Sequence, residues 1–199
     1  MTSTPDLTPA ARRMAELLAG VRDVQLTAPT PCEDTSLVGL IGHVDGLVIA
    51  FTQAATKDIP EGGSQPPSDV PSELSPDWRT RIPEQLDALA AAWLSPDAWH
   101  GMTEAGGITM SGAEAGNVAM NELVVHGWDI ARASGQPYAA GADEIESCLA
   151  FVYPAVEQSD GKGVPGLFGP AVPTSGDAAP LDRLIALTGR DPSWTPDRT

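Results

Sequence analysis

The stretch Asn121-Glu-Leu-Val-Val-His-Gly-Trp-Asp129 belongs to the best-defined helix signal in the chain. Upstream, Ser111 and Glu114 form a capping box, a pairing that satisfies free amide groups at a helix N-terminus. Downstream, a glycine and a proline follow Ala133 and supply a stop. The sequence therefore predicts a long helix that begins after Ser111 and runs to about Ala133.

Within this helix, Glu122 and His126 are four residues apart, so they project from one face. Asp129 falls within about 60° of both at helical spacing. The remaining residues of that face are apolar, which predicts that it is buried. An isolated carboxylate buried there would cost several kcal/mol, so Glu122 must be protonated, paired, exposed in a cleft or bound to a metal. Metal binding also explains the histidine.

A second predicted helix, capped by Thr35 or Ser36, carries His43 on an apolar face. Flanking glycines leave room beside the imidazole, although they equally permit close helix packing. With Glu122 and His126, His43 completes a set of two histidines and one carboxylate. These nitrogen and oxygen donors suit zinc and leave coordination positions open, and iron or nickel also fits them. The alternative is that the histidines are hydrogen-bonded core residues.

Three further side chains are candidates for supporting chemistry. Asp129 is a candidate to orient a ligand imidazole or a bound water from outside the ligand set, and its alternative role is a surface ion pair with Arg132 or another base. His100 is a candidate fourth ligand or a solvated loop residue. Cys32, just before the second helix, is either a reactive thiolate or a small buried residue.

Three other helices are predicted from apolar residues at helical spacing: Thr8 to near Val24, Pro76 to Leu94, and Asp143 towards Val156. Pro83 should kink or restart the second of these, and Pro154 should disturb the last turn of the third. Residues 57–75 are rich in proline, glycine and serine and indicate a long exposed connection.

The last forty residues are predicted to be a wrapping tail that contains a short amphipathic piece, Leu181 to Leu187, ending at Gly189. No alternating run is long enough to demand a sheet. Long helices joined by loops indicate an all-α helical bundle. At 199 residues, the chain is expected to form one domain over residues 1–199.

The formal net charge of −16 argues against nucleic acid and anionic lipid as partners, because phosphate groups would repel most of the surface. The first thirty residues lack the features of a secretory signal, and no window reaches about 18 uninterrupted apolar residues. Cys32 and Cys148 follow no metal-binding spacing, which favours free thiols in a reducing compartment. A soluble, cytoplasmic protein is expected.

Several motifs in order resemble a known family: Thr30-Pro-Cys32, the segment Leu40–Val44 with His43, and Glu122-Leu-Val-Val-His-Gly-Trp-Asp129. This order resembles the metal-binding, N-terminal domain of mycothiol-dependent maleylpyruvate isomerase. It looks more like the actinobacterial metal-binding proteins related to that domain, within the DinB-like superfamily. The tail segments Phe168–Pro173 and Leu181–Arg190 extend the resemblance over nearly the whole chain.

The resemblance implies a DinB-like four-helix bundle with an additional C-terminal helix and an irregular wrapping tail. It also implies that His43, Glu122 and His126 hold zinc in an open site suited to activating a low-molecular-weight thiol. Homodimerisation has support only at this family level.

The leading hypothesis is a metal-dependent transferase or isomerase that uses mycothiol or a related thiol as cosubstrate and acts on a small electrophilic substrate. Zn²⁺ is the expected metal, with another divalent ion as the alternative. Asp129 would tune the site from outside the ligand set. Two other functions remain open: a metal-dependent hydrolase that uses activated water, and a nonenzymatic, metal-stabilised binding or stress-response protein.

Overall fold

A computed structural model describes residues 4–32, 34–64, 73–164 and 166–196. Its α-helices are α1 (Thr8–Gly20), α2 (Leu37–Thr56), α3 (Trp78–Trp93), α4 (Gly112–Ser134), α5 (Ala142–Gln158) and α6 (Pro180–Leu187). Two short 3-10 helices and two strands complete the described elements: η1 (Asp23–Gln25), η2 (Pro96–Trp99), β1 (Met102–Ala105) and β2 (Ile108–Ser111).

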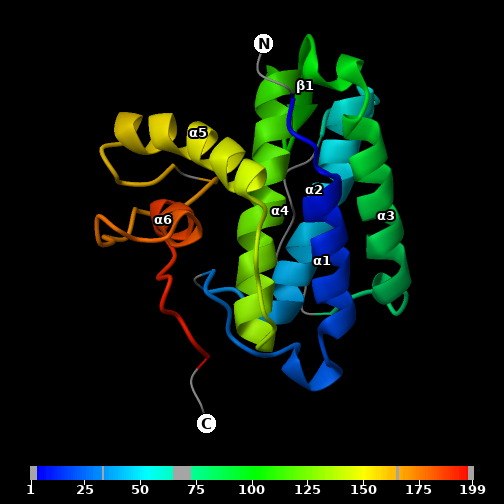
Figure 1. Ribbon diagram of the computed structural model, residues 1–199. Coiled ribbons are helices and arrows are strands. Elements are labelled where there is room, and N and C mark those ends of the chain that lie inside the picture. The colour runs from blue at the N-terminus through cyan, green and yellow to red at the C-terminus, as the bar shows by residue number, and fades with distance from the viewer. Residues whose placement is uncertain (1–3, 33, 65–72, 165, 197–199) are drawn as a thin grey trace.

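Helices α1 to α4 form a four-helix bundle (Figure 1). Helix α1 packs on α3 and α4, and α2 packs on the same two helices, so the ring order is α1, α3, α2, α4. Helix α5 crosses the outside of α4, and α6 packs on α5 (Figure 1). The predicted all-α bundle, with an added C-terminal helix and a tail, is therefore confirmed.

The two helices that carry the candidate ligands begin where their caps predict. At α4, the Ser111 hydroxyl accepts a hydrogen bond from the Glu114 amide at 3.2 Å, and the Glu114 carboxylate accepts one from the Ser111 amide at 2.8 Å. At α2, the Ser36 hydroxyl accepts from the Gly39 amide at 3.5 Å. Gly135 ends α4 in the left-handed conformation, with φ of 72°.

Helix α2 is long and apolar enough to cross a membrane by length and composition alone. This is weak evidence, because the core helix of a soluble protein passes the same test. In the bundle, the side chains of Leu37, Leu40 and Ile41 are fully buried. Burying an aliphatic side chain of this size contributes roughly 1.5–3 kcal/mol, so packing in the core accounts for the apolar character of α2.

Helix α1 is shorter than predicted, because it ends at Gly20 instead of near Val24. Val21 leaves the helical region with φ of −72° and ψ of 128°, and η1 then forms a separate turn. Val21 is nevertheless buried in the core. Its apolar side chain therefore continued the helical spacing in the sequence, although the residue lies outside the helix.

Of the predictions drawn from two prolines, a restart of the helix at Pro83 is wrong. Helix α3 continues through Pro83 without a restart, and α5 continues through Pro154 to Gln158. A proline inside a helix removes one backbone hydrogen bond and costs about 3 kcal/mol. Pro83 lies between the buried residues Ile82 and Leu86, so packing of α3 on α1 and α2 offsets the local loss.

The small antiparallel hairpin formed by β1 and β2 was not predicted. Its strands have four residues each, which is too short for a clear alternation. A signal was present in Gly106 and Gly107, which both have positive φ and form the two-residue turn that joins the strands. The hairpin leads directly into α4, because β2 ends at the Ser111 cap.

The connection predicted over residues 57–75 is described only in part, since residues 65–72 lie outside the described residues. Residues 57, 58 and 60–62 are exposed, as predicted, but the section ends in a buried residue. Ser64 is buried, its amide donates to the Glu104 carboxylate, and its hydroxyl accepts from the Gly106 amide at 3.0 Å. The described start of the connection is thus fastened to the hairpin.

After α5 the chain folds back on itself through close backbone contacts. A Cβ atom placed on Gly189 would lie 2.9 Å from the Cα atom of Gly169, which is closer than side chains tolerate. Gly189 also has φ of 87°. Glycine is required on both counts, and this turn determines where the next residue, Arg190, enters the protein.

Candidate metal centre

Three predicted ligands converge between α2 and α4. His43 comes from α2, and Glu122 and His126 come from successive turns of α4. One donor atom from each lies within 4.8 Å of the others. The Nε2 atom of His126 is 2.9 Å from the Glu122 Oε2 atom, and the Nε2 atom of His43 is 3.8 Å from the same oxygen. The two imidazole rings stand nearly perpendicular, with centroids 5.0 Å apart.

These separations fit a single metal ion. Zinc bonds to nitrogen and oxygen of about 2.0–2.1 Å place two ligand atoms of a tetrahedral site about 3.3 Å apart. The measured 2.9 Å and 3.8 Å lie on either side of that value, so small side-chain adjustments suffice. Two histidines and one carboxylate also leave coordination positions free, as in metal sites that bind a substrate or water.

Burial differs across the three side chains. His126 and Glu122 are 8% and 11% exposed, whereas His43 is 33% exposed. The site therefore opens to solvent on the α2 side, beside His43. A small molecule that reaches the three donors would approach from this side.

Electrostatics hold the buried pair in its charged form when no metal is bound. Burial alone would raise the pKa of Glu122, but the charge of His126 and hydrogen bonds from both histidines outweigh it and lower that pKa. Burial alone would lower the pKa of His126, but the charge of Glu122 and the bond to Asp129 raise it to about 10. In the metal-free protein a proton therefore sits between His126 and Glu122.

Asp129 supports His126 from the other side of its ring. The Oδ2 atom of Asp129 is 3.0 Å from the Nδ1 atom of His126, and the Asp129 side chain is fully buried. An Nδ1 proton donated to this carboxylate leaves Nε2 directed at Glu122 and His43. The alternative partner for Asp129 was Arg132, but the Arg132 guanidinium donates to the Pro192 carbonyl at 3.0 Å and lies over the Trp128 ring.

Arg190 was missed by the sequence analysis. Its guanidinium Nη2 atom donates to the Asp129 Oδ2 atom at 3.1 Å, so the same oxygen accepts from both His126 and Arg190. Arg190 is almost fully buried. A single arginine after Gly189 carries no periodic or spacing signal, so only the folded chain shows that it reaches α4.

Two other candidates lie apart from the donor group, which among the described residues contains neither His100 nor Cys32. His100 is exposed, and its Nδ1 atom contacts the Pro96 carbonyl at 2.7 Å. Cys32 is a half-buried free thiol in the loop before α2, and Cys148 is a buried free thiol on α5. Neither His100 nor Cys32 completes the candidate site.

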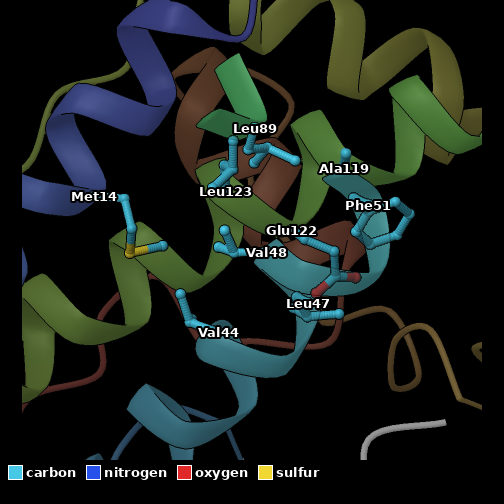
Figure 2. A pocket seen from close by; sticks show the side chains of 9 residues that line it. All are labelled: Met14, Val44, Leu47, Val48, Phe51, Leu89, Ala119, Glu122 and Leu123. Atoms are coloured by element: carbon cyan, nitrogen blue, oxygen red, sulfur yellow. The ribbon is translucent and has the colours of Figure 1, made fainter. Parts of the chain in front are cut away.

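A narrow apolar slot adjoins the candidate ligands between α2 and α4 (Figure 2). It has room for about one water molecule. Glu122 is the one polar residue of its lining; the apolar residues are Met14, Val44, Leu47, Val48, Phe51, Leu89, Ala119 and Leu123. Val44 and Leu47 are neighbours of His43 on α2, so the slot continues the site inward along apolar side chains.

Comparison with known proteins gives two matches. A family model described as the mycothiol maleylpyruvate isomerase N-terminal domain matches residues 7–131, a range that includes all three candidate ligands and Asp129. The crystal structure of the mycothiol-dependent maleylpyruvate isomerase is similar with a TM-score of 0.56 and 20% sequence identity, over 97% of this chain and 94% of that chain. At this identity the structural likeness shows a shared fold. Comparison with curated proteins finds no match.

Proposed function

The chain belongs to the mycothiol maleylpyruvate isomerase N-terminal domain family, and on that premise we propose that it is a metal-dependent enzyme that uses a low-molecular-weight thiol. Mycothiol or a related thiol is the proposed cosubstrate. The proposed reaction is transfer of the thiol to a small electrophilic substrate, or thiol-assisted isomerisation of that substrate. The observation that carries the proposal is the convergence of His43, Glu122 and His126 within 4.8 Å.

We propose that these three side chains hold a divalent metal ion, with zinc the best match to two imidazoles and one carboxylate. A metal ion in this position lowers the pKa of a thiol that binds it, so that a thiolate is available at neutral pH. Glu122 would balance part of the positive charge inside the bundle. Asp129 would keep His126 in the tautomer whose Nε2 atom has a free lone pair.

The side chains around the site suggest how small molecules would bind. The exposed edge of His43 lies on the open side of the site, where a thiol would enter from solvent. The slot beside Glu122 is apolar and has room for only about one water molecule, so the substrate would also bind on the open side beside His43.

We further propose that residues 1–199 act as one domain in the cytoplasm. Reduced thiols are available in that compartment, and both cysteines of the chain are free. Small molecules are the proposed partners. A net charge of −16 makes association with nucleic acid unfavourable.

Steady-state assays on natively purified full-length protein, with zinc per chain measured in the same sample, would test the proposal. Consumption of an electrophile should require both the metal and an added thiol, and should stop in His126→Ala. Turnover without thiol would favour a hydrolase instead. Bound zinc with no turnover of any tested electrophile would favour the nonenzymatic function.

A further inference from the structure

We propose that Arg190 is a positioning residue that acts through Asp129 to hold His126 ready for metal binding, and so couples the C-terminal segment to the metal centre. The C-terminal segment is defined here as residues 180–196, which include α6. This inference rests on the metal site of the proposed function. It adds that a residue 61 positions from Asp129 in the sequence helps to set metal affinity.

The first support is a continuous chain of hydrogen bonds. Arg190 Nη2 donates to Asp129 Oδ2 at 3.1 Å, and the same oxygen is 3.0 Å from His126 Nδ1. On the other side of its ring, His126 Nε2 is 2.9 Å from Glu122 Oε2. A change in the position of the guanidinium therefore reaches the candidate ligand through one intervening carboxylate.

The second support is the burial of this chain. Asp129 is 0% exposed and Arg190 is 8% exposed. Asp129 Oδ1 and Arg190 Nε have no hydrogen-bond partner among the described residues. Oδ2 therefore makes the contacts that hold the Asp129 carboxylate in place, and the loss of Arg190 would leave His126 as its remaining partner. Asp129 would then be free to rotate and would fix the imidazole less well.

The third support is that hydrogen bonds within the C-terminal segment fix the position of the Arg190 guanidinium. The Arg190 Nη1 atom donates to the Thr188 carbonyl at 2.7 Å, and the Arg190 amide donates to the Ile185 carbonyl at 3.1 Å. The preceding Gly189 packs against the backbone of Gly169. The guanidinium is thus held by the end of α6 before it reaches α4.

Coupling of this kind acts in both directions. If docking of the C-terminal segment strengthens metal binding, metal binding must strengthen docking of that segment by the same factor. Zinc should therefore slow amide hydrogen exchange in residues 180–196, although none of the three candidate ligands lies in that segment.

Arg132 provides a matched control. It also joins α4 to the tail, because its guanidinium donates to the Pro192 carbonyl at 3.0 Å, but it has no bond to Asp129. Arg132→Met and Arg190→Met each remove one arginine contact between α4 and the C-terminal segment. Only Arg190→Met removes the hydrogen bond to Asp129, the residue that contacts His126.

The decisive experiment measures zinc affinity of the full-length variants by competition with a chromophoric chelator. Asp129→Asn should weaken zinc binding about 10- to 100-fold, the range typical when the partner of a ligand histidine is lost, and Arg190→Met should reproduce a measurable part of that loss. Arg190→Lys should recover part of this loss, and Arg132→Met should bind zinc like the unaltered protein. In the Asp129→Asn background, Arg190→Met should have little further effect.

Equal zinc affinity in Arg190→Met and Arg132→Met would overturn the inference while leaving the proposed metal site intact. Absence of stoichiometric zinc in the unaltered protein would overturn the metal site itself. If Arg190→Met does not fold, hydrogen exchange of the unaltered protein with and without zinc decides the matter. Unchanged exchange in residues 180–196 would then refute the coupling.

Discussion

His126 lies one helical turn after Glu122 on α4, and its Nε2 atom is 2.9 Å from the Glu122 carboxylate. Both side chains project from one face of α4, so the two candidate ligands point to one place. A proton and a metal ion compete for the same nitrogen of His126. This competition makes both the stability and the metal affinity of the protein depend on pH.

The stability of the metal-free protein should be greatest between pH 4.5 and 6.5, the ordinary pKa values of Glu122 and His126. The raised pKa of His126 gives a stabilisation that is complete below 6.5 and is lost as pH rises towards about 10. The lowered pKa of Glu122 gives a stabilisation that is present above 4.5 and is lost as pH falls through its lowered value.

Urea unfolding of EDTA-treated protein measures this effect. For one proton the slope above pH 6.5 should not exceed about 1.4 kcal/mol per pH unit. Glu122→Gln should flatten the slope, because its amide carries no charge to stabilise the imidazolium. A slope that is the same in this variant would show that other groups cause it.

Zinc content should depend on His126 and be independent of His100. The unaltered protein should retain about one zinc per chain after dialysis, and His126→Ala should retain none, because two donors bind zinc much less tightly than three. His100→Ala is the matched control, since His100 is exposed and outside the donor group. Elemental analysis measures the metal. Full zinc occupancy in His126→Ala would contradict the assignment.

The two free thiols should react at very different rates. Cys148 is fully buried, and burial together with the charge of Glu144 raises its pKa to about 12. Cys32 is half-buried in a loop. A chromogenic disulfide reagent should therefore detect one thiol in the native protein and two in denaturant. Cys32→Ser should remove the native signal, and rapid native reaction in that variant would argue against the burial of Cys148.

Helix α5 should be fastened to the bundle by the pair between Arg13 and Glu144. Their side chains are 20% and 6% exposed and form two hydrogen bonds, at 3.2 Å and 2.8 Å. Arg13→Met should lower the free energy of unfolding by about 1.5–3 kcal/mol, because it removes the cation from a buried carboxylate and leaves the Gly141 amide as its donor. Arg79→Met, which removes an exposed pair with Asp23, should cost roughly 0–1 kcal/mol. Equal losses would show that burial does not distinguish the two pairs.

If the proposed reaction occurs, uncharged electrophiles should be preferred to dicarboxylates. The Glu122 carboxylate belongs to the candidate ligands, and the slot beside them has an apolar lining that includes no cationic side chain among the described residues. An added anion near Glu122 should reduce kcat/KM by about tenfold or more. Matched pairs of an ester and its free acid would measure this preference. A faster acid would indicate a cationic contact outside the slot.

The sequence was a good guide where structure is set by neighbouring residues. Ser36 and Ser111 cap helices through local hydrogen bonds, so the starts of α2 and α4 were predictable. The shared face of Glu122 and His126 follows from helical spacing in the same way. The helix does not restart at Pro83, because tertiary packing outweighs a local cost of this size.

Other parts of the site depend on how distant segments meet. Helical spacing does not show that His43 lies beside α4. From the residue pattern, His43 was either a metal ligand or a hydrogen-bonded core residue. The family resemblance implied that it joins Glu122 and His126. Arg190 lies 61 positions beyond Asp129, and no local pattern relates the two. The hairpin at Gly106 and Gly107 was missed for a different reason. Its turn signal was present, but strands of four residues are too short to show a clear alternation of apolar and polar residues.

The backbone contact between Gly169 and Gly189 leaves no space for a methyl group. Even an alanine at position 189 would act as a wedge between two passes of the chain. Because Arg190 follows directly, such a wedge would lift the guanidinium away from α4. A defect at the candidate metal centre can thus originate in a residue that has no functional group of its own.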